Sequence, residues 1–337
     1  MYTDEDLTSA VGHGIFNDAS VQQFRHFMAQ SKNTNLVDEE NFRLISGFND
    51  VFVVIASGLL LVSLAWIGAM MVPWLGALAL SLGAWGLAEY FVRQRRMALP
   101  AIGLLLAFLG GMFALPILYF DFAGQHVSES SLVLSGILTA IAARMHWLRF
   151  KVPITVAVGT AAAVVCVVAI IVTAIPAALS MLMPLVFAGG LVTFAIAMLW
   201  DAGDRSRQTR RSDVAFWLHL AAAPMIVHPI FSSLGILDGL ESVSSSLLVL
   251  GLYVVLALIS IAVDRRAIMV SALIYVVFAL SSLLNNYGML SYSFAITGVC
   301  IGATLLLLSA FWQNSRQAVL KWVPQTIQLR LPELKAH

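Results

Sequence analysis

Two histidines lie in one apolar segment of the sequence, His219 and His228, and Trp217 precedes the first of them. Imidazole changes its charge near neutral pH, so a histidine inside an apolar helix suits proton transfer or solute binding. The two histidines are nine residues apart, which at about 100° per residue places them on opposite faces of a helix. This spacing disfavours a shared metal ion, and we predict no metal site.

Two prolines interrupt the same segment and set the surroundings of His228. Pro224 and Pro229 cannot donate the backbone hydrogen bonds that the carbonyl groups of Leu220 and Met225 would otherwise accept. Interrupted helices recur at ligand sites of membrane proteins. We predict a loosened or broken helix in which His228 binds a solute or relays a proton. The simpler alternative is a neutral imidazole that is bonded to a freed carbonyl group.

Further polar side chains gather where a later apolar segment ends. Asn285 and Asn286 stand beside Tyr287 and near Tyr292, while Tyr275 lies deeper in the segment. Asparagine and tyrosine suit both a polar binding pocket and the interfacial belt of a membrane helix. The belt is the simpler interpretation, and the pocket interpretation makes Asn285 and Asn286 candidate solute-binding residues.

Few carboxylates lie in or beside the apolar segments. Glu89 stands four residues before Arg93, a spacing that favours an ion pair on a helix surface. A carboxylate in a membrane can also couple proton movement to transport. Asp201 and Asp264 lie beside arginines at segment ends, and the ion-pair interpretation applies to both.

The sequence lacks the motifs of the main enzyme and nucleotide-driven classes. It contains no phosphate-binding loop, HExxH, GxSxG or CxxC pattern, and no dinucleotide-binding glycine pattern in a suitable context. A net charge of +1 provides no field that attracts nucleic acid. We predict a protein that is not an enzyme, uses no cofactor and binds no nucleic acid.

The composition is that of a protein with many membrane-spanning helices. Of 337 residues, 60% are hydrophobic and 11% are charged, and the mean hydropathy is +0.90. Soluble domains usually have about 25% charged residues, and one span needs about 20 apolar residues. We predict an all-α, polytopic membrane helix bundle with about ten spans, near 51–70, 73–92, 99–119, 130–147, 153–175, 180–200, 214–234, 243–263, 267–285 and 291–312.

Pairs of glycines occur in three of these segments, and small residues let membrane helices approach closely. The pairs are Gly110-Gly111, Gly189-Gly190 and, with the GxxxG spacing, Gly298 and Gly302. We predict close helix packing at each pair rather than a site that specifies a dimer.

Basic residues indicate the orientation in the membrane. All 19 lysines and arginines fall in the two tails, or in and beside every second connection, and cytoplasmic loops are rich in these residues. We therefore predict a cytoplasmic helical pair and tether at 1–50, a bundle at 51–312 and a cytoplasmic tail at 313–337. Arginine clusters recur at intervals of roughly 50–65 residues, as in duplicated hairpins. Alternating topology alone also explains this spacing and is the simpler interpretation.

Two short helices are predicted before the tether. Thr3 and Asp6 have the spacing of a capping box, Gly12 and Gly14 end the first helix, and Asn17 caps the second. The apolar side of the second helix consists of Val21, Phe24, Phe27 and Met28. About 28 residues cannot bury a core of their own. This side must therefore rest on the bundle, on a second copy, on the membrane or on another protein.

Several short motifs link the chain to a known architecture. They are Asp6-Leu7, Gly14-Ile15 and Gln22 in the helical pair, Gly47-Phe48-Asn49-Asp50 before the first span, and Arg95-Arg96 after the second. With them the chain resembles a group of uncharacterised bacterial multi-pass inner-membrane proteins, a domain of unknown function. The resemblance implies the bacterial inner membrane and no particular activity. The chain is also similar to ten-span drug/metabolite-type transporters in its span count and cytoplasmic termini, although its N-terminal segment is longer.

These observations lead to two functional hypotheses. The first is a carrier or flippase for a neutral, amphipathic or lipid-like solute, with candidate site residues Trp217, His219, Pro224, His228, Pro229, Asn285 and Asn286. The second is a membrane scaffold or sensor subunit that recruits a protein partner through residues 1–40. Ten spans exceed what anchoring needs, which favours the first. The expected partners are the lipid bilayer, a small amphipathic solute and, in the second hypothesis, a protein at residues 1–40.

Overall fold

The computed structural model of the protein describes residues 4–31, 48–125, 129–207, 209–234, 243–286, 293–328 and 331–332. Every regular element within these ranges is a helix. The all-α fold class that the sequence predicts is therefore confirmed.

Long apolar helices make up the bundle. Their bounds are α3 (Phe48–Met71), α4 (Pro73–Ala88), α5 (Ala98–Phe122), α6 (Glu129–Phe150), α7 (Ile154–Ala174), α8 (Leu182–Ala202), α9 (Arg210–Ser232), α10 (Val243–Val263), α11 (Ala267–Asn286) and α12 (Ser293–Ala310). In the described part of the chain nine spans are long and apolar enough to cross a membrane. A tenth is present if α12 and the following α13 (Trp312–Leu320), which are bent by 76°, form one span. This agrees with the polytopic bundle of about ten spans.

Shorter elements extend or connect the spans. A π-helix, η1 (Glu89–Gln94), continues α4, and a 3₁₀-helix, η2 (Pro176–Met181), precedes α8. After α13 the chain forms one more turn of helix, α14 (Gln325–Gln328).

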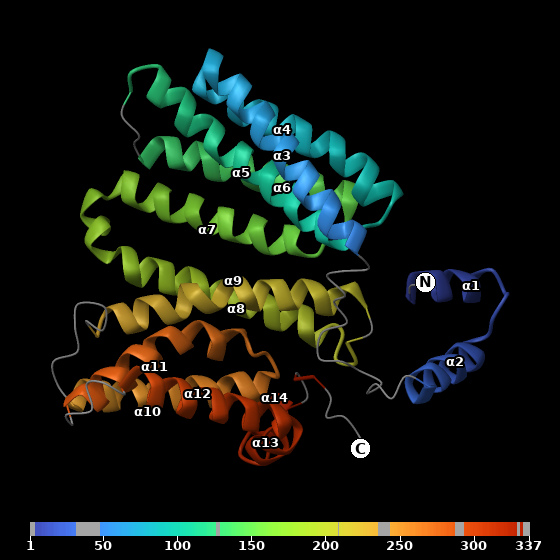
Figure 1. Ribbon diagram of the computed structural model, residues 1–337, viewed down its shortest axis with the longest axis vertical. Coiled ribbons are helices and arrows are strands. Elements are labelled where there is room, and N and C mark those ends of the chain that lie inside the picture. The colour runs from blue at the N-terminus through green and yellow to red at the C-terminus, as the bar shows by residue number, and fades with distance from the viewer. Residues whose placement is uncertain are drawn as a thin grey trace.

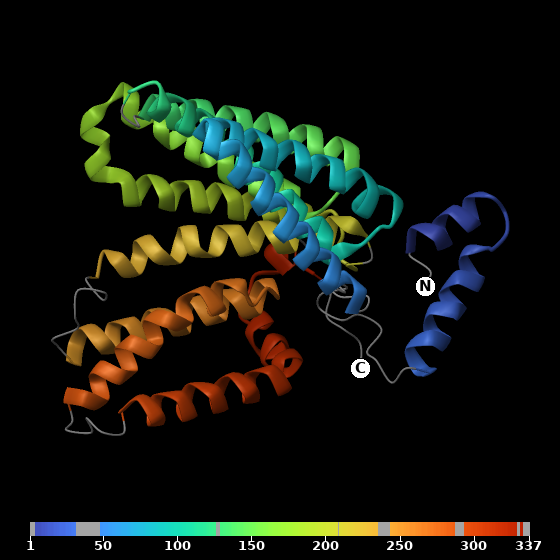
Figure 2. The same cartoon turned by 45° about the horizontal axis from the view of Figure 1, so that its top comes forward.

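Successive helices pack side by side, and α9 lies at the centre of the bundle (Figure 1). The most extensive contacts join α8 to α9, α4 to α5 and α6 to α7, and α9 also contacts α7 and α11. Figure 2 shows the first spans and the last spans on opposite sides of α9. Within its membrane window 56% of α9 is buried, compared with 17% of α3. A side chain on α9 is therefore better placed than most to contact several helices.

Four turns lie together at the end of the bundle on the right in Figure 1, and we call this end the basic end. They connect α4 with α5, α6 with α7, α8 with α9, and α10 with α11. Each contains one residue with a left-handed backbone, φ between 52° and 60°, and these four are Arg96, Lys151, Arg207 and Asp264. A non-glycine residue pays roughly 1–2 kcal/mol for this conformation. Contacts of the side chains must offset that cost.

Two of the three predicted glycine pairs let helices approach closely. A Cβ atom at Gly111 would overlap α4, and one at Gly190 would lie 2.9 Å from the backbone carbonyl carbon of Met225. Around Gly298 and Gly302, in contrast, no described atom lies within 4 Å of an added Cβ atom. Close packing is therefore confirmed for α5 on α4 and for α8 on α9, whereas the GxxxG prediction for α12 is wrong within the described chain.

The N-terminal helical pair consists of α1 (Asp4–Gly12) and α2 (Asp18–Ser31), as predicted. The side chain of Asn17 accepts the backbone N–H of Ser20 at 2.6 Å, which confirms the predicted cap. Thr3 lies outside the described residues. Both views show the pair apart from the bundle (Figures 1 and 2). Val21 is buried, but Phe24 and Phe27 are 38% and 65% exposed, so these two rings do not rest on the bundle.

Candidate functional site

The central helix α9, which carries both candidate histidines, is continuous. It begins after Thr209, whose hydroxyl accepts the backbone N–H of Arg211, and it runs through both Pro224 and Pro229. The prediction of a broken helix is therefore wrong. Two missing hydrogen bonds do not end a membrane helix that neighbouring helices hold in place. Pro224 is exposed and Pro229 is buried.

His228 contacts a tyrosine of the neighbouring helix α11. Its Nδ1 atom lies 2.6 Å from the hydroxyl oxygen of Tyr275, in a hydrogen bond between α9 and α11. The tyrosine ring stacks on Phe231 with 4.6 Å between ring centroids and 8° between the planes. At Nδ1 the partner of His228 is therefore the hydroxyl of Tyr275 and not a carbonyl group freed by proline. The imidazole is exposed on the surface of α9, so it remains accessible to a solute.

His219 lies in a different environment. It is 0% exposed, and its Nδ1 donates to the carbonyl of Ala215 at 2.8 Å within α9. The same nitrogen lies 3.8 Å from a carboxylate oxygen of Asp201, and Phe194 packs edge-on at 5.2 Å between ring centroids. His219 and His228 thus have separate partners, as their spacing predicts. Among the described residues no three His, Cys, Asp or Glu side chains are arranged to hold a metal ion.

The other predicted site residues do not join His228. Trp217 packs against the apolar cluster that includes Ala157 of α7 and Ala197 of α8. Asn285 and Asn286 are the last two residues of α11, and their side chains lie outside the described part of the structure. Among the described side chains of the predicted set, that of His228 forms a hydrogen bond with a side chain of another span.

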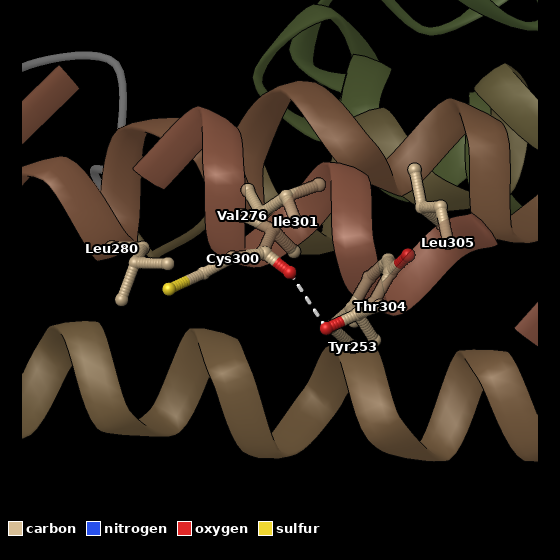
Figure 3. A pocket seen from close by; sticks show the side chains of 7 residues that line it. All are labelled: Tyr253, Val276, Leu280, Cys300, Ile301, Thr304 and Leu305. Carbon is tan, nitrogen blue, oxygen red and sulfur yellow. Dashed lines mark hydrogen bonds between the residues drawn. The ribbon is translucent and has the colours of Figure 1, made fainter. Parts of the chain in front are cut away.

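A pocket of about 170 Å³ lies between α10, α11 and α12 (Figure 3). Its lining residues are Tyr253, Val276, Leu280, Cys300, Ile301, Thr304 and Leu305. The hydroxyl of Thr304 donates to the carbonyl of Cys300 at 2.7 Å, which is the dashed contact in Figure 3. Both of these residues are exposed, so the pocket opens at the surface of the bundle. None of the lining side chains carries a charge.

Sequence reasoning missed this pocket because its residues come from three separate spans. The available signal was weak: Cys300 and Thr304 are four residues apart and so share one face of α12. Nothing in the local pattern indicates that Tyr253 lies opposite that face. A packing defect between helices depends on how they are arranged and not on any one of them.

Five charged residues form a buried charge cluster at the basic end: Asp201, Arg207, Asp264, Arg265 and Arg316. Arg265 donates to both carboxylate oxygens of Asp201, at 2.6 and 3.2 Å, and to the carbonyl of Ser212 at 3.1 Å. Arg265 is 3% exposed and Asp201 is 0% exposed. This contact joins the end of α8 to the turn between α10 and α11.

Asp264 is the second acceptor of the buried charge cluster. Its carboxylate accepts Arg207 at 2.9 Å and the indole N–H of Trp312 at 2.6 Å, and it forms an ion pair with Arg316 at 3.5 Å. Its backbone carbonyl accepts Arg207 as well, at 2.9 Å. Burial and the positive charge of Arg265 lower the pKa of the Arg207 guanidinium, and the negative charge of Asp264 opposes them. Arginine still remains charged at neutral pH, so this is a buried ion-pair network.

The structure confirms that Glu89, Asp201 and Asp264 form ion pairs with arginines, although most of the arginine partners are not the predicted ones. Glu89 contacts Arg93 at 3.2 Å, as the spacing predicts, but it also accepts Arg149 of α6 at 2.7 and 3.1 Å. Asp201 and Asp264 were expected to pair with adjacent arginines. Their partners in the buried charge cluster are instead distant along the chain, because the turns of separate hairpins meet at the basic end.

Comparison with protein-family models, curated proteins and solved structures finds no match. The resemblances based on short motifs stay predictions, and the chemistry of the site rests on the contacts of this chain.

The described sites differ in what they can do. An uncharged polar group of a solute can form a hydrogen bond with His228 or Tyr275 in place of the other residue. The pocket can accept an apolar chain. The buried charge cluster directs its guanidinium groups at carboxylates and carbonyls of the chain itself. It therefore holds helices together rather than offering free charge to a solute.

Proposed function

We propose that this multi-pass membrane protein is a carrier or flippase for a neutral, amphipathic or lipid-like solute. The observation that supports the proposal is the hydrogen bond between His228 and Tyr275, which joins two membrane-spanning helices at an exposed imidazole. Polar groups inside a membrane are costly, and they are functional candidates for that reason. A solute hydroxyl or carbonyl can replace one partner of this hydrogen bond without leaving a charge unpaired.

The pocket between α10, α11 and α12 supports an amphipathic solute. Val276 lines the pocket and follows Tyr275 directly along α11, so this helix carries both the tyrosine of the polar pair and part of the apolar lining. The uncharged lining favours a neutral solute, because a buried charge would have no partner there. The opening at the surface of the bundle lets an apolar chain enter from the lipid.

The first test follows a fluorescent, NBD-labelled phosphatidylcholine in proteoliposomes, where external dithionite bleaches the label in the outer leaflet. We expect the wild-type protein to raise the bleached fraction above that of protein-free vesicles. His228→Ala and Tyr275→Phe should slow this movement by a factor of about five to ten, since one hydrogen bond contributes about 1 kcal/mol.

A matched control is His13→Ala, which removes a histidine bonded to Ser9 within α1 and outside the spans. Equal rates for His13→Ala and the two site variants would contradict the assigned site.

A second experiment detects bound solutes that are smaller than a phospholipid. It is native mass spectrometry of protein released from nanodiscs of its own membrane. A molecule bound to the wild type and lost from His228→Ala supports the carrier. The absence of both lipid movement and bound molecule contradicts it.

A second candidate function is that of a membrane scaffold or sensor subunit. It is supported by α1 and α2, which stand apart from the bundle with Ile15, Phe16, Phe24 and Phe27 exposed. Exposed apolar patches mark interaction sites more often than unused surface. Deletion of residues 1–40 separates this role from solute binding in the bundle.

We also propose that the membrane is the bacterial inner membrane and that the basic end and both termini face the cytoplasm. The four turns at the basic end carry lysines and arginines, and the bias of these residues toward cytoplasmic loops sets the orientation of membrane proteins.

A further inference from the structure

The chain after α13 returns to the basic end and contacts it through backbone carbonyl groups. We call residues Gln325–Gln328 (α14) and Leu331–Pro332 the C-terminal strap, and Figure 1 shows α14 beside α13. Arg316 donates to the carbonyl of Pro332 at 2.6 Å, and Arg205 donates to the carbonyl of Leu331 at 3.0 Å. One arginine belongs to α13 and the other to the turn between α8 and α9. Two successive carbonyls of the C-terminal strap thus bridge two separate parts of the fold.

An apolar contact accompanies these hydrogen bonds. Leu331 is 3% exposed and belongs to a cluster with Val263 at the end of α10 and Leu320 at the end of α13. Phe194 and Met198 of α8 pack against the same cluster. Burying a leucine side chain contributes roughly 1.5–3 kcal/mol. The leucine therefore gives the C-terminal strap a hold on α8, α10 and α13 at once.

A side chain of the C-terminal strap also bonds to the chain that precedes it. The side-chain amide of Gln328 donates to the carbonyls of Leu320 and Val323, at 2.8 and 2.7 Å. The first of these bonds satisfies a carbonyl at the end of α13, which a helix leaves unpaired, and the second holds the turn that follows it. Together they hold α14 close to the end of α13.

We propose that the basic end carries a peptide-docking socket whose occupant is the C-terminal strap of the same chain. The socket consists of Arg205 and Arg316, which recognise two backbone carbonyls, and of the apolar cluster that holds Leu331. In the docked state the strap adds a second link between the α8–α9 turn and α13, beside the one that Asp264 makes by contacting Arg207 and Arg316. Release of the strap removes this second link. This proposal goes beyond solute transport and does not depend on it.

The structure also shows why arginine is suited to this task. Arg316 is 0% exposed and contacts Asp264 of the buried charge cluster as well as Pro332. A guanidinium group has five N–H donors in a fixed plane, so it can hold a carboxylate on one edge and a carbonyl on another. Undocking the strap removes one acceptor from Arg316, which favours the docked state.

The test compares the reactivity of single cysteines with a water-soluble maleimide in protein held in nanodiscs. Both natural cysteines, Cys166 and Cys300, are first replaced by alanine. Leu331→Cys then reports on the buried position in the C-terminal strap, and Ile327→Cys, whose natural side chain is 51% exposed, is the matched control. We expect Leu331→Cys to react at least about tenfold more slowly, because reaction requires local opening of the docked segment.

A third variant tests the socket itself. Arg205→Gln removes the donor to the Leu331 carbonyl, and its side chain is only partly buried. In the Leu331→Cys background it should speed labelling at least about fivefold, the factor that corresponds to one hydrogen bond of about 1 kcal/mol, and it should leave labelling of Ile327→Cys unchanged. Equal labelling rates for Leu331→Cys and Ile327→Cys in the protein with intact Arg205 would overturn the proposal. That outcome does not depend on whether the Arg205 variant folds.

Discussion

Among single residues, Arg265 of the buried charge cluster has a large expected effect on stability. It is buried in the charge cluster, where it contacts both carboxylate oxygens of Asp201 and the carbonyl of Ser212. Replacing one partner of a buried ion pair leaves the other charge without compensation, at a cost of about 3–5 kcal/mol. An ion pair at the surface is worth about 0–1 kcal/mol.

Arg265→Gln should therefore lower the free energy of unfolding by about 3–5 kcal/mol. The measurement is an SDS titration of protein in mixed micelles, followed by tryptophan fluorescence. Arg93→Gln is the control, since Arg93 is 53% exposed in its contact with Glu89, and it should cost no more than about 1 kcal/mol. Similar losses for the two variants would show that the buried charge cluster does not stabilise the fold.

The hydrogen bond between His228 and Tyr275 has a different role from the ion pairs of the buried charge cluster. The histidine side of this hydrogen bond is exposed, so its loss should change solute handling more than folding. Tyr275→Phe keeps the ring that stacks on Phe231 and removes the hydroxyl alone. This variant therefore separates the effect of the hydrogen bond from the effect of packing.

At the scale of elements, the N-terminal pair and the bundle behave as independent parts. The pair lies apart from the spans in both views, and its apolar side includes Phe24 and Phe27, which are exposed. Local capping by Asn17 begins α2, and neither helix of the pair lies against the bundle in Figures 1 and 2. A part that does not pack on the spans is not needed for their stability.

Deletion of residues 1–40 should leave the free energy of unfolding of the bundle unchanged. In the scaffold role it should abolish capture of protein partners by chemical crosslinking in native membranes. Phe27→Ala tests the apolar side alone, and Gln23→Ala, an exposed polar residue on the same helix, is its control. A deletion variant that captures the same partners as the wild type would contradict the scaffold role. A bundle that loses stability would contradict the independence of the two parts.

At the scale of the whole molecule, the alternation of helix direction gathers the basic turns at one end. The prediction that this end is cytoplasmic follows from the bias of lysine and arginine toward that side. Gln94 lies at the basic end and Gln125 follows α5 at the opposite end, and both are exposed. These two positions report on the orientation without disturbing a buried contact.

In a cysteine-free background expressed in bacteria, Gln125→Cys should react with a membrane-impermeant maleimide in intact cells. Gln94→Cys should react only after the cells are lysed. The measurement is the fraction of protein labelled under each condition, with full labelling after lysis as the control for reactivity. The opposite result would reverse the proposed orientation and place both tails outside the cytoplasm.

The sequence by itself determined the features that depend on neighbouring residues. The spans follow from hydropathy, because a run of about 20 apolar residues is stable as a membrane helix wherever it lies in the chain. The cap at Asn17 and the contact between Glu89 and Arg93 follow from spacing within one helix. The continuity of α9 through Pro224 and Pro229 could not be predicted in this way, since packing of neighbouring helices overrides the lost hydrogen bonds.

Only the tertiary structure decided the contacts between helices, on which the candidate site depends. Nothing local indicates that His228 meets Tyr275, or that Arg265 meets Asp201 rather than an adjacent carboxylate. The pocket and the docking of Leu331 likewise require several helices to be in place. The physical reason is that hydropathy measures how apolar a helix face is and does not show which neighbouring helix that face packs against. Close packing and the pairing of buried polar groups select one arrangement among them.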